Sequence, residues 1–378
     1  MKLALLGSTG SIGTQALDVL EKLESDVFSI TALAAGKNVA LLSEQIKRWK
    51  PKIVSVYSPE EVNQLSKLID TSQIEILHGE PGLIACAIQS GADRVLNAVV
   101  GAAGLSSTLA ALEADIDVAL ANKESLVIGG ELVQKVLEKS NAKLLPVDSE
   151  HSALWQLLIP HQSQEIEKII ITASGGALRD WPLDQLDQAS PQDVLKHPNW
   201  NMGARVTVDS ATLVNKAFEV IEAHWLFQFP YENIEAVVHP QSLVHGMVEL
   251  NDGMVLAHIG MPDMKVPIQF ALTTPLHQPM NTPRMNWVGQ SLTFDSICNE
   301  RYPAFSTLLD AAAKGGTSLA ALNAADEVLI ERFLAGSISF TQIASGLQEI
   351  SEKYSPTPLS LEAITEADQW ARQTAACL

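Results

Sequence analysis

The chain opens with Lys2-Leu3-Ala4-Leu5-Leu6-Gly7-Ser8-Thr9-Gly10-Ser11-Ile12-Gly13. The apolar run predicts a buried strand, the glycines predict a tight turn, and residues 14–23 have helical periodicity. Glycines in such a turn let the backbone approach a pyrophosphate, which the amides of a helix N-terminus stabilise. The spacing is GxxGxxG rather than GxGxxG, so a plain strand-to-helix turn is the alternative. We expect a dinucleotide to contact Gly7, Ser8, Thr9, Gly10, Ser11, Ile12 and Gly13.

The same alternation of strand and helix continues to about residue 147. Buried-type strands are predicted at 27–33, 52–57, 74–77 and 94–100, with helices at 39–49, 59–69 and from Glu80 between them. This order predicts an α/β fold with an N-terminal doubly wound, Rossmann-like parallel sheet. The start of the chain has no secretory signal and no apolar run reaches the length of a bilayer span, so we expect a cytoplasmic protein.

Composition limits the class of protein. A chain of 378 residues is too long for one ordinary core, so two or three domains are expected. Its net charge of −19 argues against nucleic acid and anionic membranes as partners, because both attract basic surfaces. Cys86, Cys298 and Cys377 have none of the spacings of zinc or redox sites and are expected to be free thiols.

The end of the second predicted strand, Ala34-Ala35-Gly36-Lys37-Asn38, indicates which cofactor binds. An NAD enzyme usually has an acidic residue there for the ribose hydroxyls. A lysine with an amide partner suits a 2′-phosphate instead, so NADPH is preferred. Two further strand ends, Val99 to Gly104 and Ala121-Asn122-Lys123-Glu124-Ser125, open onto helices. Lys123 and Glu124 are expected to face cofactor or substrate, unless Lys123 only begins a solvated helix.

The segment Pro146-Val147-Asp148-Ser149-Glu150-His151 carries two carboxylates at alternate positions. In an extended segment such side chains point the same way. Asp148 and Glu150 could then share a hard cation, with Ser149 adding an oxygen. The alternative is a helix start, where acidic residues stabilise the positive end of the helix dipole.

The next stretch is expected to form a phosphate cradle and a lid. Residues 166–173 predict a buried strand that ends in Ser174-Gly175-Gly176, a hydroxyl followed by flexible backbone. The long segment 179–205 contains His197 and Trp200, which favour a lid over the active site. A surface excursion is the alternative.

A helix predicted at 213–227 has one polar face with Asn215, Glu219 and Glu222, and Lys216 at its margin. Glu219 could deliver a third carboxylate beside Ser210, which precedes the helix. A solvated polar face is the alternative. Strands follow at 233–238, 243–250 and 254–259, and their His239, His245 and His258 are interpreted as core or supporting histidines.

The last part of the chain changes character. Proline-rich residues 274–300 are expected to form a connecting arm, and helices at 303–314, 318–334, 340–353 and 359–376 predict a C-terminal bundle. The expected domains are 1–147 for NADPH, 148–273 for metal and substrate with the lid at about 179–205, and 301–378 for the bundle.

In their order along the chain, these motifs closely resemble the 1-deoxy-D-xylulose 5-phosphate reductoisomerase family. The strings that carry the resemblance are 7–13, 35–38, 121–126, 146–151, 174–176, 197–203 and 208–219. The resemblance covers essentially the whole chain and implies an α+β catalytic domain with a lid, a homodimer and a role in non-mevalonate isoprenoid synthesis.

Site residues follow from the same resemblance. It implies Mn²⁺ or Mg²⁺ on Asp148, Glu150 and Glu219, with Lys123, His197 and Trp200 as further catalytic residues. Implied substrate contacts are Lys123, Ser149, Glu150, Ser174, His197, Ser210, Asn215, Lys216 and Glu219. Implied cofactor contacts beyond the glycine turn are Gly36, Lys37, Asn38, Asn122, Glu124 and Gly203.

The chemistry suits these residue types. A divalent ion would polarise the ketose carbonyl during carbon-skeleton rearrangement, and NADPH would reduce the aldehyde so formed. Two other functions stay open. Another NADP-dependent reductase of a phosphorylated small molecule would want a catalytic cysteine in its second domain. A non-catalytic NADP-binding regulator would not need three carboxylates.

Overall fold

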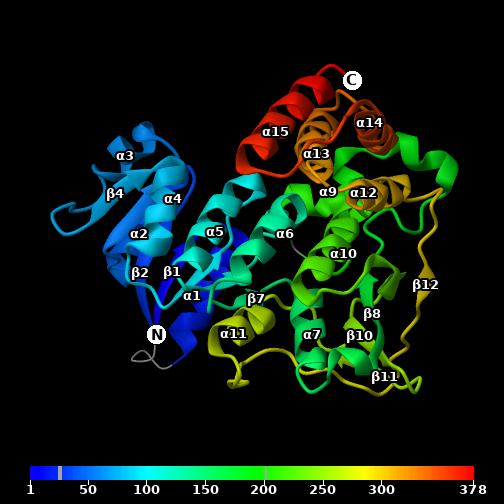
Figure 1. Ribbon diagram of the computed structural model, residues 1–378, viewed down its shortest axis with the longest axis horizontal. Helices are drawn as coiled ribbons and strands as arrows, with labels where there is room; N and C mark the ends of the chain where they lie inside the picture. Colours follow the sequence, from blue (N-terminus) through cyan, green and yellow to red (C-terminus); the bar gives the residue numbers. More distant parts are fainter. Residues whose placement is uncertain (24–27, 201) are drawn as a thin grey trace. The chain divides into compact units, whose positions relative to one another are not determined.

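The structure, a computed structural model, describes residues 1–23, 28–200 and 202–378 and consists of two compact units (Figure 1). The first unit contains Met1–Ser125, Glu131–Ser152 and Asp263–Asn281. The second contains Leu126–Gly130, Ala153–Pro262 and Thr282–Leu378. Val27, where the second predicted strand began, and Asn201 of the predicted lid lie outside the described residues.

A seven-stranded sheet forms the centre of the first unit, and all its strands are parallel, as predicted. The strand order is β4-β3-β2-β1-β5-β6-β7, so the sheet grows in opposite directions from β1 and β5. Ligands of such sheets bind at the carboxyl ends of the strands beside this switch point. The strands are β1 (Lys2–Leu6), β2 (Ser29–Ala34), β3 (Ile53–Val56), β4 (Glu75–His78), β5 (Arg94–Asn97), β6 (Asp117–Leu120) and β7 (Leu144–Pro146).

Helices follow most of these strands. Their apolar faces complete a core in which Leu3, Leu5 and Leu33 are fully buried. Burial of β1 on both faces explains why it is a continuous apolar run rather than an alternating one. The helices are α1 (Ser11–Lys22), α2 (Val39–Trp49), α3 (Pro59–Leu65), α4 (Gly79–Ile88), η1 (Gly101–Gly104), α5 (Leu105–Glu113), the two ends of α6 (Glu124–Leu137) and the start of α7 (Ser149–Leu158).

One helix of the first unit comes from much later in the chain and was not predicted. α11 (Lys265–Thr273) packs against α1, and its Ile268 joins the core of this unit. Arg94 Nη1 donates to the carbonyl of Ala271 at 2.7 Å and so ties the helix to β5. Pro267 is tolerated because it lies in the first turn, where its missing amide costs no intrahelical bond. The sequence-based division instead kept residues 148–273 together.

The second unit has a mixed five-stranded sheet in the order β11-β10-β8-β9-β12. Only β8 and β9 pair in parallel among the described strands of this sheet. The arm contributes β12, in which Asp295 pairs with Val238 of β9. The strands are β8 (Ile166–Ala173), β9 (Ile234–Val238), β10 (Val244–Leu250), β11 (Val255–Ile259) and β12 (Asp295–Ser296).

α10 (Val214–Phe227) covers this sheet, with Val220 and Ala223 packed against Ile169 and Val248. The C-terminal bundle is confirmed, and its helices gather in the orange and red part of Figure 1. Its members are α12 (Pro303–Lys314), α13 (Ser318–Leu334), α14 (Phe340–Lys353) and α15 (Leu361–Ala375). In the described ranges no helix is both long and apolar enough to cross a membrane.

The segment 179–205 is not a structureless loop. It contains η3 (Leu183–Gln188) and α8 (Pro191–Val194), and α9 (Ala204–Thr212) begins at its end. Ser190 caps α8 by accepting a hydrogen bond from the amide of Asp193 at 3.3 Å. The short 3₁₀ helices η2 (Ser163–Glu165) and η4 (Tyr231–Asn233) complete the unit.

Candidate active site

The glycine turn after β1 has the geometry of a phosphate loop. Gly7 has φ +84°, and a Cβ there would lie 2.3 Å from the carbonyl oxygen of Ala98. A Cβ at Gly13 would lie 2.3 Å from the carbonyl oxygen of Gly7. These two positions therefore require glycine. α1 has no side-chain cap and no acidic residue in its first turn, which leaves its N-terminus suited to an anion.

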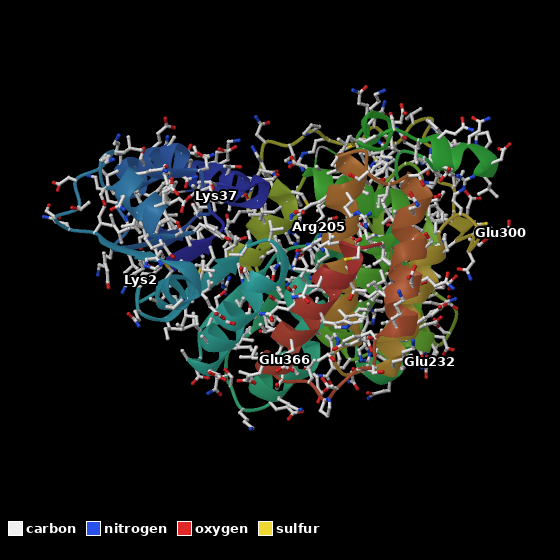
Figure 2. All side chains as sticks on the ribbon, turned by 90° about the horizontal axis from the view of Figure 1, so that it is seen from above. Lys2, Lys37, Arg205, Glu232, Glu300 and Glu366 are labelled. Atoms are coloured by element: carbon white, nitrogen blue, oxygen red, sulfur yellow. The ribbon has the colours of Figure 1, made fainter. Side chains whose placement is uncertain are left out.

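Lys37 and Asn38 lie between β2 and α2, where the sequence placed the cofactor ribose. Asn38 caps α2 by accepting a hydrogen bond from the amide of Leu41 at 3.2 Å. Lys37 is an exposed residue of the first unit, and Figure 2 labels its position. Its ammonium lies 5.1 Å from the centroid of the Tyr57 ring. Gly36 has open space around its Cβ position, so packing does not require a glycine there.

Asn122 and Glu124 belong to a hydrogen-bond network that joins the ends of β5 and β6. Asn122 is 1% exposed and donates to the Gly101 carbonyl at 2.9 Å and to Glu124 Oε2 at 2.8 Å. A Cβ at Gly104 would lie 2.3 Å from Asn122 Oδ1. The two predicted cofactor residues thus shape the turn at the carboxyl ends of these strands.

At the two carboxylates, the extended conformation considered for Asp148 and Glu150 is wrong and the helix start is confirmed. α7 begins at Ser149, because Glu150 in its first turn stabilises the helix N-terminus. Lys123 Nζ lies 2.5 Å from Asp148 Oδ2, and each side chain is 14% exposed. The Ser149 hydroxyl donates to Glu150 Oε2 at 2.5 Å.

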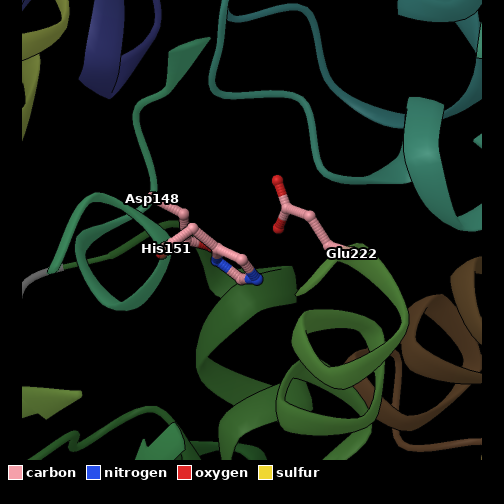
Figure 3. Close-up of side chains that lie close together, drawn as sticks. All are labelled: Asp148, His151 and Glu222. Atoms are coloured by element: carbon pink, nitrogen blue, oxygen red, sulfur yellow. The ribbon is translucent and has the colours of Figure 1, made fainter. Parts of the chain in front are cut away.

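His151 lies on the same turn as Asp148 and is fully buried. Figure 3 draws these two side chains at the start of α7 together with Glu222 of α10. A histidine, whose ring nitrogen is able to bind a metal, stands beside two acidic residues in the sequence, but His151 was not among the predicted site residues.

Ser174, of the predicted phosphate cradle, and His197, of the predicted lid, meet in the second unit. His197 Nδ1 accepts hydrogen bonds from the amides of Asn199 at 3.2 Å and Trp200 at 2.9 Å. The proton of the neutral ring is therefore on Nε2, which donates to Ser174 Oγ at 2.9 Å. Ser174 Oγ also accepts from the Gly176 amide at 3.1 Å. Within the part of the chain that the structure describes, no acceptor takes its own hydrogen, which is available to a ligand.

The neutral ring of His197 agrees with its surroundings. Burial lowers the pKa of His197 below its usual value, and the positive charge of Arg179 lowers it further. Arg179 donates from Nη1 to the Ser174 carbonyl at 2.9 Å. Arg179 also pairs with Asp180, with Nη2 2.7 Å from Oδ2, so its charge beside the Ser174 turn is partly balanced.

The lid residues rest on the second sheet. Asn199 Nδ2 donates to the Pro240 carbonyl at 2.8 Å and to Ser242 Oγ at 2.9 Å. The Trp200 ring lies edge-on to His245, with centroids 6.2 Å apart. His239 is held between the Thr293 carbonyl and the Leu243 amide, which confirms it as a core histidine.

α9 and α10 carry the remaining predicted substrate residues. Gly203 caps α9, which ends near Ser210, and Leu213 in the left-handed region joins it to α10. A Cβ at Gly176 would lie 2.4 Å from Ala211 Cα, so the Ser174 turn and α9 approach closely. The turn carries the hydroxyl of Ser174, and α9 carries the hydroxyl of Ser210.

On α10, Glu219 is buried and is held by the two polar residues before it. Asn215 Nδ2 donates to Glu219 Oε1 at 2.5 Å, and Lys216 forms an ion pair with the other carboxylate oxygen. Glu219 is 1% exposed and Lys216 is 4% exposed. A solvated polar face, which was the alternative for this helix, is therefore wrong.

Arg205, at the start of α9, anchors the end of the lid segment to the C-terminal bundle (Figure 2). It donates to Glu327 Oε1 at 2.7 Å and to Asn323 Oδ1 at 2.8 Å, and lies 3.4 Å from Asp326 Oδ2. Glu327 in turn accepts from Arg372 of α15 at 2.5 Å. Burial raises the pKa of Asp326 to about 6, although Arg205 acts in the opposite direction.

Family profiles described as "1-deoxy-D-xylulose 5-phosphate reductoisomerase", its C-terminal domain and the DXP reductoisomerase C-terminal domain match residues 3–130, 144–227 and 259–374. The chain is 46% identical to the 1-deoxy-D-xylulose 5-phosphate reductoisomerase of Chlorobium phaeovibrioides, over 99% of this chain and 98% of that protein. It is 47% identical to the protein of that name from Chlorobaculum tepidum, with 99% and 98% covered.

Solved structures agree. The reductoisomerase of Zymomonas mobilis in complex with NADPH superposes with a TM-score of 0.91 at 38% identity, covering 100% of this chain and 98% of that one. A DOX-P reductoisomerase in complex with NADPH, fosmidomycin and magnesium gives a TM-score of 0.93 at 37% identity, with 100% and 98% covered.

Proposed function

Because this chain belongs to the 1-deoxy-D-xylulose 5-phosphate reductoisomerase family, we propose that it performs that family's reaction. It rearranges and reduces 1-deoxy-D-xylulose 5-phosphate to 2-C-methyl-D-erythritol 4-phosphate in non-mevalonate isoprenoid synthesis, using NADPH and a divalent metal. The observation that carries the proposal is 46% identity over 99% of the chain. When bound, the metal would polarise the substrate carbonyl and NADPH would supply the hydride.

The residues of the first unit fit NADPH. The turn at Gly7 and Gly13 has no room for side chains, so its backbone can approach a pyrophosphate at the N-terminus of α1. Lys37 is proposed to pair with the 2′-phosphate. The proposed cofactor residues are Gly7, Ser8, Thr9, Gly10, Ser11, Ile12, Gly13, Gly36, Lys37, Asn38, Asn122, Glu124 and Gly203.

Asp148, Glu150 and Glu219 are the proposed metal ligands. Three carboxylates form a hard-oxygen donor set, which suits Mg²⁺ or Mn²⁺. Support comes from each unit separately: Asp148 and Glu150 flank the start of α7, and Glu219 is a buried carboxylate on α10. Lys123 contacts Asp148 and would stabilise negative charge on substrate oxygens.

The substrate phosphate is proposed to bind in the second unit. Ser174 has a hydroxyl hydrogen to donate, and Lys216 supplies a buried cation. Phosphate binding remote from the reacting carbons orients them. The other proposed substrate contacts are Lys123, Ser149, Glu150, His197, Ser210, Asn215 and Glu219.

Trp200 and His197 are proposed to close over the substrate, which keeps water from a reactive aldehyde. As expected from the sequence, we propose that residues 1–147 bind NADPH and that residues 148–273 bind metal and substrate, with the lid at about 179–205. Residues 274–300 are proposed to form a connecting arm. We further propose a cytoplasmic homodimer.

Product identification tests this function. The protein is incubated with 1-deoxy-D-xylulose 5-phosphate, NADPH and Mn²⁺, and the product is analysed by mass spectrometry and NMR. We expect 2-C-methyl-D-erythritol 4-phosphate. Reduction of another phosphorylated aldehyde instead would favour a different reductase, and NADPH binding without turnover would favour a regulator.

A further inference from the structure

We propose that Tyr57 is a specificity-determining residue, because its ring positions the Lys37 ammonium for the 2′-phosphate of NADPH. The proposal rests on the cofactor assignment above. It concerns a residue outside the sequence motifs, brought beside Lys37 by the pairing of two strands.

Strand pairing places the two residues side by side. β2 and β3 pair in parallel, with Ala34 opposite Ser55. The pairing continues past the strand ends: the Ala35 amide donates to the Ser55 carbonyl at 2.9 Å, and the Tyr57 amide donates to the Gly36 carbonyl at 3.4 Å. The backbone therefore fixes Tyr57 next to the Gly36-Lys37 turn, at the carboxyl edge of the sheet where a dinucleotide ribose is expected.

The side chains meet in a cation–π contact. Lys37 Nζ lies 5.1 Å from the ring centroid, within the range in which the face of an aromatic ring attracts an ammonium. Lysine loses much rotational freedom when its ammonium is held in one place. A ring that already restricts the ammonium reduces the freedom that phosphate binding would remove, so it favours a ligand that carries the extra phosphate.

The nearby Glu61 carboxylate has Ser58 as its main partner, and the charge of Lys37 also contributes to lowering the pKa of Glu61. The Ser58 hydroxyl donates to Glu61 Oε2 at 2.6 Å, and this bond lowers the pKa of Glu61. In the ranges that the structure describes, Lys37 makes no ion pair. An incoming phosphate would therefore meet a cation held by an uncharged ring and would have no salt bridge to break.

The exposure of Tyr57 indicates that its ring serves a purpose other than packing in the core. Its side chain is 62% exposed, so the ring contributes little to the core. A single exposed aromatic residue is common on protein surfaces. The test must therefore separate an effect through Lys37 from no effect and from direct stacking on adenine.

Two ligands that differ only at the 2′ position make this separation. Calorimetry measures the binding of adenosine 2′,5′-bisphosphate and adenosine 5′-monophosphate to the unaltered protein and to Tyr57→Phe and Tyr57→Leu. An exposed cation–π contact corresponds to roughly two- to fivefold in affinity. We expect Tyr57→Leu to lose about that much for the bisphosphate and none for the monophosphate, and Tyr57→Phe to keep most of the unaltered affinity.

A Lys37→Gln background provides the control. There Tyr57→Leu should have no further effect on either ligand, because the ring no longer has a cation to position. Equal weakening of both ligands by Tyr57→Leu, or unchanged binding, would overturn the proposal and leave the cofactor assignment intact. Unaltered protein that binds the two ligands equally would overturn both, so the two failures are distinguishable.

Discussion

Lys37 is the residue at which one charge sets the choice of cofactor. An ammonium favours the 2′-phosphate, whereas a carboxylate favours the ribose hydroxyls of NADH. The unaltered protein should prefer NADPH at least tenfold, a difference of about 1.4 kcal/mol. Lys37→Asp should narrow or reverse this preference, measured as the ratio of kcat/KM for the two cofactors. Equal use of both by the unaltered protein would contradict the assignment.

Trp200 provides the predicted lid with a large aromatic ring to place over a substrate. The His197 ring holds its amide, and its own ring meets His245. Trp200→Ala should lower kcat because water enters the closed site, while the Kd for NADPH stays nearly unchanged. Trp200→Phe should restore part of the turnover. Unchanged kinetics for the alanine variant would mean that the segment is only surface.

At the level of elements, the joint between α9, α13 and α15 depends on Arg205. Its side chain is 16% exposed and faces Asp326, which is fully buried. Arg205→Ala leaves that carboxylate and Glu327 without their shared cation, and removing one partner of a buried ion pair costs about 3 kcal/mol or more. Urea unfolding should show this loss.

Lys353→Ala on α14 is the matched control for Arg205→Ala. The Lys353 side chain is 50% exposed and pairs with an exposed Glu349, so its loss should cost less than about 1 kcal/mol. Equal losses for the two variants would show that the Arg205 network adds nothing to stability.

Asp326 gives the same joint a pH dependence. Its pKa is raised to about 6, above an unfolded value of about 3.9. The folded state therefore binds this proton more tightly than the unfolded state does. The resulting contribution to the free energy of unfolding is present at low pH and is lost as the pH rises through about 6. Asp326→Asn removes it, so the Tm of the variant relative to the unaltered protein should rise across this range. A constant or falling difference would contradict the assignment.

At the scale of the whole molecule, the regular elements were predictable where local pattern determines them. β8 is an apolar run with a clear end at Ser174, and α2 and the C-terminal helices α12 to α14 have unbroken helical periodicity. The parallel sheet followed from the alternation of strand and helix. Each of these features is determined by residues that are close together in the sequence, so the local pattern is enough to predict it.

Features that depend on distant segments were not predictable. α11 joins the core of the first unit through Arg94, which is 177 positions away from Ala271. Arg205 meets Glu327 across 122 positions. Tyr57 reaches Lys37 only because β2 and β3 pair. At Asp148 the sequence allowed both an extended segment and a helix start, and no local rule decided between them.

Glu219, the proposed third metal ligand, lies far along the chain from Asp148 and Glu150, so no local pattern links it to them. Glu222, one turn further on α10, is equally buried, at 1% exposed. Replacing each proposed ligand by its amide keeps its shape and removes a charge. Asp148→Asn, Glu150→Gln and Glu219→Gln should therefore fold and bind NADPH. Glu222→Gln tests the neighbouring position, and Glu232→Gln is the exposed control.

Consumption of NADPH with 1-deoxy-D-xylulose 5-phosphate, followed as Mn²⁺ is added to chelator-treated protein, measures whether turnover requires a metal held by Asp148, Glu150 and Glu219. The unaltered protein and Glu232→Gln should show no turnover without metal and saturable turnover with it, while the three ligand variants lose both metal affinity and turnover. Turnover without metal would contradict the metal requirement, and metal-dependent turnover retained in Glu219→Gln, or an equal loss in Glu222→Gln, would contradict Glu219 as the third ligand.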